Sequence, residues 1–132
     1  MEQTIRNRME AEIAGILEKL DIPTASNATD ILKTILLAAV TEPDSFDLND
    51  QYDKLGRAHH LTRERVRQII SHTIGRYWRM DTLMLLRDHF GYPIDFSDEQ
   101  KNCLPVNGVG KPVNAEFVRW IASNLRLKYH LE

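Results

Sequence analysis

The stretch "HHLTRERVRQIISH", positions 59–72, places three arginines within five residues and continues with apolar residues at helical spacing. Guanidinium groups bind carboxylates, phosphates and the edge of guanine through paired hydrogen bonds. Residues 51–80 carry seven basic and two acidic side chains, whereas residues 1–50 carry four basic and ten acidic. These net charges of +5 and −6 make the basic region a candidate surface for a polyanion. A solvated basic helix face is the alternative that charge alone leaves open.

A helix predicted over 62–79 divides its side chains between two faces. The positions expected to face the core are largely apolar, namely Val66, Ile69, Ile70, Thr73, Ile74 and Tyr77. The positions expected on the outer side are Glu64, Gln68, Ser71, Gly75 and Arg79, flanked by Arg65, Arg67 and His72. That outer side suits a DNA major groove, since arginine can pair with guanine, glutamine with adenine and glutamate with cytosine.

Two sets of side chains are predicted to contact DNA in that arrangement. Base contacts are predicted from Arg65, Arg67, Gln68, Glu64 and Ser71. Phosphate contacts are predicted from Lys54, Arg57, Arg63, His72, Arg76 and the helix start at Thr62, where backbone amides are free. Gly75 costs the helix about 1 kcal/mol relative to alanine, so we expect another surface to approach closely there. The alternative, of equal weight on physical grounds, is an amphipathic helix of a small bundle with a wet, arginine-rich side.

The residues before this helix suit a helix-turn-helix over about 51–79. Gly56 supplies a small residue where the two helices cross. His60 falls at a turn position that needs a left-handed backbone, which histidine tolerates better than most residues other than glycine. Thr62 can cap the second helix. Apolar contacts between the two helices are expected from Leu55, Leu61, Val66 and Ile69.

Helical spacing of apolar residues predicts most of the remaining chain. The further helices are expected at 4–20, from Ser26 or Asn27 to Pro43, around Tyr52, Leu55 and Ala58, at 81–90, and from Asn114 onward. Between 91 and 111 the periodicity disappears, which predicts a long loop with a small extended element around "YPIDF" at 92–96. The predicted fold is all-α: one compact six-helix domain over 1–130 that contains the helix-turn-helix.

Composition and motifs exclude several other classes of protein. The longest apolar run, "ILLAAV" at 35–40, is far below the roughly 20 residues that cross a bilayer, and no signal peptide is visible. We therefore expect a cytoplasmic protein without a membrane partner. The single cysteine, Cys103, excludes an internal disulfide. The histidines and the acidic stretch at 95–100 lack the spacing of a metal or catalytic site, so we expect no metal, no cofactor and no enzymatic activity.

Two separated blocks resemble the C-terminal DNA-binding effector domain of the stage-zero sporulation protein A family, response regulators that commit endospore-forming bacteria to sporulation. Residues 52–78 follow the helix-turn-helix of that family without a gap, including "RVRQIISHTIGRYW". Residues 111–127, "KPVNAEFVRWIASNLRL", are similar to its final helix, with the Lys-Pro-x-Asn-x-Glu-Phe start and the Leu-Arg-Leu end. The segment 22–36, "IPTASNATDILKTIL", is similar to another helix start of the family.

The resemblance implies a six-helix domain that reads a short promoter box with its fourth helix and binds repeated boxes as a tandem homodimer. It places base reading at Arg65, Arg67 and Gln68. Arg65 is the residue of the family, whereas the family has an acid at the position of Arg67 and an arginine at that of Gln68. Because Arg67 cannot accept a hydrogen bond from cytosine and Gln68 favours adenine over guanine, we expect DNA binding with a changed target sequence.

Two further departures from the family bear on partners and regulation. The loop at 91–111 is longer than that of the family, and it lies where the resemblance implies contact with the RNA polymerase sigma subunit. The phosphoacceptor receiver domain of the family is absent from this sequence, which leaves a fragment of a longer regulator or a stand-alone effector; a helix directly after Met1 favours the second. The competing hypothesis for function is a helical interaction module that has lost specific DNA reading and modulates a related regulator.

Overall fold

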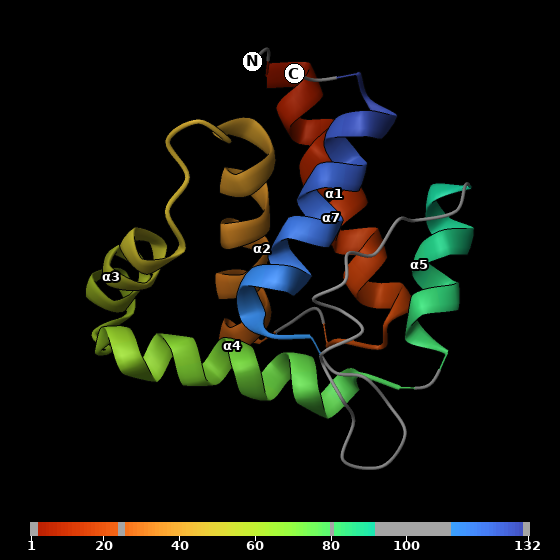
Figure 1. The fold of residues 1–132 in the computed structure, drawn as a ribbon. Coiled ribbons are helices and arrows are strands. Elements are labelled where there is room, and N and C mark those ends of the chain that lie inside the picture. The colour runs from red at the N-terminus through yellow and green to blue at the C-terminus, as the bar shows by residue number, and fades with distance from the viewer. Residues whose placement is uncertain (1–2, 24–25, 80, 92–111, 131–132) are drawn as a thin grey trace.

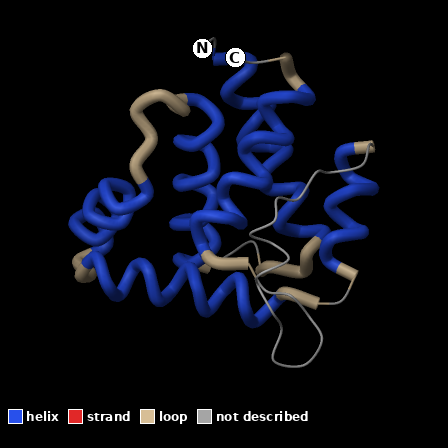
Figure 2. Tube along the Cα trace, in the orientation of Figure 1, coloured by secondary structure: helices blue, strands red, loops and turns tan. Residues whose placement is uncertain are grey.

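The computed structural model describes residues 3–23, 26–79, 81–91 and 112–130, and in this part of the chain every regular element is a helix (Figures 1 and 2). In chain order the helices are α1 (Gln3–Lys19), α2 (Asn27–Thr41), α3 (Leu48–His59), α4 (Arg63–Tyr77), α5 (Thr82–Phe90) and α7 (Asn114–Lys128). The predicted all-α class with six helices is therefore confirmed. The loop expected at 91–111, its extended element at 92–96 and Cys103 lie outside the described residues, except for Gly91. None of the described helices combines the length and apolar character that a bilayer crossing requires.

Three helices, α1, α2 and α7, form the centre of the molecule, and α4 runs across one end of them (Figure 1). α2 contacts α1, α3, α4 and α7, while α5 packs against α1 and α7. The apolar positions predicted for the last helix are all buried, namely Phe117, Val118, Ile121, Ala122 and Leu125. Because α4 meets the other helices along one side, its opposite side is left facing outward.

Polar side chains cap the starts of three helices. Ser26, Asp47 and Thr62 each accept a hydrogen bond from a backbone amide in the first turn of α2, α3 and α4, at 3.1, 2.9 and 3.1 Å. Amides in the first turn of a helix have no carbonyl partner within the helix. Each cap therefore gives one of these N–H donors a hydrogen-bond acceptor. The cap predicted at Thr62 is confirmed, and of the two residues expected at the start of the second helix, Ser26 is the cap and Asn27 is the first helical residue.

The prediction that the fourth helix runs over 62–79 is wrong at its C-terminal end. α4 ends at Tyr77 because Trp78 adopts an extended backbone, with φ −76° and ψ 124°. The Trp78 indole is buried against α7, with its ring centroid 6.3 Å from those of both Phe117 and Trp120. Burial of this large aromatic group offsets the loss of the last helical residues.

Arg79 consequently lies beyond the helix rather than on its outer face. Its backbone N–H donates to the Thr82 hydroxyl at 2.8 Å, at the start of α5. Its guanidinium pairs with the Asp21 carboxylate at 2.7 Å, which ties the link after α4 to the link after α1. The outward face of α4 is therefore shorter than the sequence pattern predicts.

Candidate functional site

A tight turn joins α3 to α4 and fixes the angle between them. Gly56 lies at the crossing, where an added β-carbon would stand 2.5 Å from the carbonyl oxygen of Leu61. The Leu61 N–H donates to the Gly56 carbonyl at 2.7 Å. His60 has the left-handed backbone predicted for it, with φ 60° and ψ 43°. The small residue and the left-handed turn are both confirmed, and any larger residue at position 56 would force the turn to move.

Packing holds one side of α4 against the core. Val66, Ile70 and Ile74 are buried, each with 2% or less of its surface exposed. The remaining positions predicted for this side are half-buried at its edges, namely Ile69, Thr73 and Tyr77. The short helix predicted around Tyr52, Leu55 and Ala58 is present as α3, although the Ala58 side chain is exposed. Because its apolar side is buried against the core, α4 presents its polar side to solvent.

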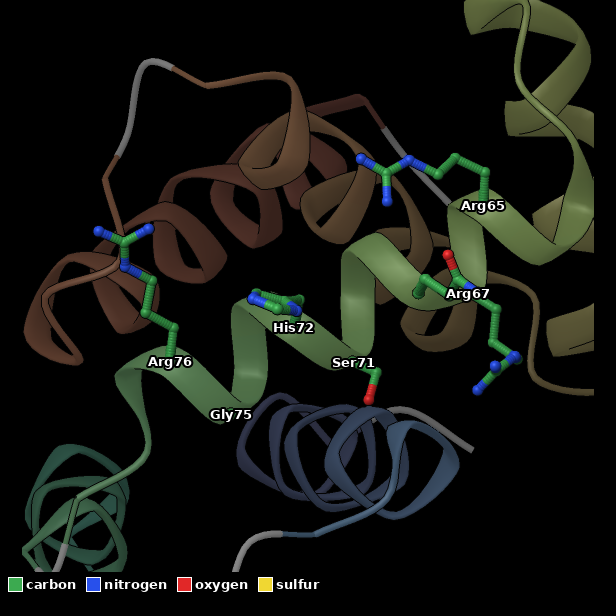
Figure 3. A pocket seen from close by; sticks show the side chains of 7 residues that line it. Arg65, Arg67, Ser71, His72, Gly75 and Arg76 are labelled. Carbon is green, nitrogen blue, oxygen red and sulfur yellow. The ribbon is translucent and has the colours of Figure 1, made fainter.

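An open hollow of about 550 Å³ runs along that outward side (Figure 3). All of its described lining belongs to α4, namely Arg65, Arg67, Gln68, Ser71, His72, Gly75 and Arg76. Six of these seven residues are ones that the sequence predicts to contact DNA. Gly75 adds no side chain to the lining, which leaves room for a close surface. The structure thus brings most of the predicted contact residues together on one helix.

Three basic or titratable side chains of this lining share one flank of α4. Arg65, His72 and Arg76 lie on the same flank, and both guanidinium groups extend away from the helix (Figure 3). Within the described residues Arg65 and His72 make no ion pair, and the Arg76 guanidinium lies 5.7 Å from the ring centroid of Tyr77. At 1.5 Å per residue the two arginines are about 16 Å apart along the helix axis. The two guanidinium groups make this flank positively charged, and it is open to solvent.

Arg67 and Gln68, by contrast, are engaged with Glu64 one turn earlier. The Arg67 Nε donates to both Glu64 carboxylate oxygens at 3.0 Å, and a second guanidinium nitrogen also pairs with that carboxylate. The Arg67 hydrogen bond lowers the pKa of Glu64, and Gln68 adds a weaker hydrogen bond in the same direction. In the free protein, Arg67 and Gln68 therefore bind the Glu64 carboxylate, and all three residues are predicted base contacts. We call Glu64, Arg67 and Gln68 the acidic clasp.

The predicted phosphate contacts divide in the same way. Arg63 donates from Nε to the Asp53 carboxylate at 2.8 Å, so it ties the start of α4 back to α3. Lys54 and Arg57 are exposed on α3, and no described residue pairs with either of them. Thr62 is occupied as the helix cap, which leaves other amides of the first turn to face a ligand. Asp53 is a partner that the sequence reasoning missed, because nothing in local spacing marks a pair ten residues apart.

A second residue that the sequence reasoning missed is Asn114, the first residue of α7. It is buried, and its side-chain amide donates to the Tyr52 hydroxyl at 3.0 Å and to the Arg67 carbonyl at 3.2 Å. The Lys-Pro-x-Asn start of this helix is the signal that could have drawn attention to it. Asn114 connects the outward helix to two others.

The chain matches no model in a scan against known protein families. The resemblance to the sporulation effector domain therefore rests on the motifs in the sequence.

Proposed function

We propose that the protein is a sequence-specific DNA-binding regulator of transcription that inserts α4 into the major groove. The observation that carries this proposal is the basic row of Arg65, His72 and Arg76 along an open hollow. A helix whose apolar side is buried can present such a row to a polyanion without unfolding. The major groove, about 12 Å wide, admits one α-helix.

Position along α4 assigns different roles to the two arginines of the row. Arg65 lies in the first turn of α4, and in helix-turn-helix proteins the N-terminal residues of the second helix contact base edges. Arg65 therefore reads a base, with guanine as its preferred partner. Arg76 lies in the last turn, where the helix leaves the groove, and it binds a backbone phosphate together with His72.

The α3 side of the turn supplies the other half of the phosphate contacts. Lys54 and Arg57 are exposed cations on α3, and the free amides at the start of α4 add a favourable helix dipole. Phosphate contacts at both ends of α4 hold the helix in the groove, and base contacts between them supply specificity. The acidic clasp must exchange its internal pairs for base edges if Arg67 and Gln68 read DNA.

A salt titration tests this function directly. Selection from random duplexes first supplies a preferred site, and fluorescence anisotropy then measures its affinity between about 50 and 200 mM salt. Affinity is expected to fall steeply with salt, since each neutralised phosphate adds about 0.9 to the logarithmic slope. Arg65→Ala is expected to cost about 1–3 kcal/mol on the selected site and far less on a random duplex. Arg6→Ala, which removes an exposed arginine from α1, is the matched control and is expected to change little.

An equal loss on all sequences would remove Arg65 from the base-reading role. Absence of any salt-dependent duplex binding would sink the proposed function itself. One observation favours a second candidate in that case. The acidic clasp neutralises Arg67 within the free protein, as expected of a surface that has turned from nucleic acid to protein. The second candidate is therefore a helical module that binds a related regulator.

From the sequence and the resemblance we propose three further properties. They are a cytoplasmic location, binding to repeated promoter boxes as a tandem homodimer, and contact with the RNA polymerase sigma subunit. Sedimentation of the protein on one box and on two adjacent boxes tests the second property. Two boxes are expected to bind two copies with a higher affinity per copy than one box does.

A further inference from the structure

The Asn114 side chain joins three helices at one buried point. It lies at the start of α7, and its amide nitrogen donates to the Tyr52 hydroxyl of α3 at 3.0 Å and to the Arg67 carbonyl of α4 at 3.2 Å. A backbone carbonyl can only accept, so the amide nitrogen must face it, and both of its hydrogens are used. Tyr52 is 3% exposed, and burial raises the pKa of its phenol. The hydrogen bond to Tyr52 is therefore buried, and both hydrogen bonds of the link are directional.

At the start of α7, the Asn114 side chain bonds to other helices instead of capping its own helix. Asparagine is among the best helix caps, yet the cap position of α7 is taken by Val113, whose side chain makes no capping hydrogen bond. Val113 is also one of the exposed large apolar residues of the described chain. Asn114 stands one residue too late to cap, and its amide turns inward instead. α7 begins without a polar cap, while a good capping side chain beside it bonds to other helices.

The accepting carbonyl lies at the reading end of α4. Arg67 stands between Arg65 and Gln68, the other two positions at which base reading is expected. The rest of the α4 contact with the core is largely apolar, through Val66 and Ile70 among others. Apolar packing is non-directional, so it tolerates small rotations and slides of a helix. A hydrogen bond to a backbone oxygen restricts both, because its strength falls steeply with angle and distance.

We infer that Asn114 is a positioning residue for DNA reading. It fixes the rotation of α4 about its axis and its position along that axis, and so determines where Arg65 meets the base edges. This inference rests on the proposed function. Asn114 touches no DNA itself and acts through the Arg67 backbone. Its loss leaves the basic row in place but lets α4 settle in a different register, so that phosphate contacts survive and base contacts weaken.

The test compares specificity with stability in matched variants of the whole chain. Asn114→Leu removes both donated hydrogen bonds at similar volume, and Asn114→Asp replaces the donors with acceptors. Tyr52→Phe is the matched control, since it removes one hydrogen bond from the same buried point and keeps the link to Arg67. Asn124→Ala is the second control, because Asn124 donates within α7 to the Trp120 carbonyl at 2.7 Å. All variants are measured at a temperature at which circular dichroism shows them folded.

The measured quantity is the ratio of affinities for the selected site and for a random duplex. Both Asn114 variants are expected to lower this ratio about fivefold or more, as the loss of one base contact does, with little change on the random duplex. Tyr52→Phe and Asn124→Ala are expected to lower thermal stability and keep the ratio. A merely structural role for Asn114 predicts that all four variants lose stability and keep the ratio.

Hydrogen exchange in the free protein gives a readout that needs no DNA. Amides of α4 near Arg67 are expected to exchange faster in Asn114→Leu than in Tyr52→Phe, relative to amides of α2. A folded Asn114→Leu protein that keeps the wild-type ratio would overturn the inference and leave the proposed function standing. So would a Tyr52→Phe protein that loses the ratio equally. A wild-type protein that binds no duplex would overturn the proposed function, and this inference with it.

Discussion

Charged side chains serve opposite purposes on α4 and around Glu12 of α1. The Glu12 carboxylate accepts from Lys128 Nζ at 3.0 Å and from the Tyr129 hydroxyl, and it pairs with His89 Nε2 at 3.1 Å. These groups come from α1, α5 and the end of α7, and the Glu12 and His89 side chains are only 10% and 12% exposed. In the acidic clasp of α4, the Glu64 and Arg67 side chains are 60% and 48% exposed.

The difference separates two uses of charge. The charges around Glu12 hold helices together, whereas those of α4 remain exposed to solvent. Exposed pairs in water contribute about 0–1 kcal/mol, because solvent screens them and long side chains lose freedom in forming them. A converging set around a mostly buried carboxylate is shielded from solvent and joins helices far apart in sequence. The α4 charges can therefore be exchanged for a ligand at low cost, whereas the Glu12 cluster cannot be opened without loosening α5 and α7.

Glu12→Gln is expected to have the largest effect, because it removes the charge of the mostly buried carboxylate. The amide keeps the shape but leaves Lys128 and Tyr129 beside a weaker, neutral acceptor. Removing a charged acceptor from a shielded network costs about 2 kcal/mol of unfolding free energy. Urea unfolding followed by circular dichroism measures it. Duplex affinity of the folded variant should equal that of the wild type, and a matching loss of affinity would contradict the separation of the two regions.

Acid should remove the same stabilisation gradually. Burial alone would raise the pKa of Glu12 above its ordinary value of 4.5, but hydrogen bonds from Tyr129, Lys128 and His89 outweigh it and hold the pKa lower. The contribution of Glu12 is therefore complete above pH 4.5 and is lost as pH falls through the lowered pKa. Unfolding free energies of wild type and Glu12→Gln, measured from neutral pH downward, are expected to converge below pH 4.5. A constant difference over that range would show that ionisation of Glu12 is not the source.

Glu64→Gln is expected to have the smallest effect, because it removes the charge of an exposed carboxylate. Unfolding free energy should change little, because the pair with Arg67 is open to solvent. Duplex affinity should rise about two- to fivefold and the salt slope by about one, since Arg67 is released to bind a phosphate or base. Anisotropy titrations at several salt concentrations measure both. A fall in affinity confined to the selected site would instead identify Glu64 as a base reader.

Features that depend on neighbouring residues could be predicted from the sequence. The left-handed His60, the Thr62 cap and the need for glycine at position 56 all follow from residue type at a fixed offset within one turn. The buried positions of α7 follow from helical periodicity in the same way. These predictions succeed because backbone geometry over a few residues has few solutions.

Features that depend on distant residues could not be predicted in this way. The end of α4 is set by Trp78 packing on α7, so the local helical pattern carries no mark of it. The Asn114 link spans 47 residues to Arg67, and the hydrogen bond from Tyr129 to Glu12 spans 117. The gathering of these side chains on one outward face of α4 was predictable from helical spacing. The pairing of Arg67 and Gln68 with Glu64 depends on rotamers that spacing alone does not choose.

The link from Asn114 to Arg67 also gives the chain an order of assembly during its synthesis. α3 and α4 are adjacent in sequence and pack on each other, so the turn between them closes as soon as both are made. Asn114 is added 47 residues after Arg67, which is about 2–10 s later at ordinary translation rates of roughly 5–20 residues per second. If Asn114 sets the register of α4 as inferred above, a nascent chain carries its arginines for some seconds before α7 can fix that register, and the selectivity proposed for α4 develops only after α7 has been made.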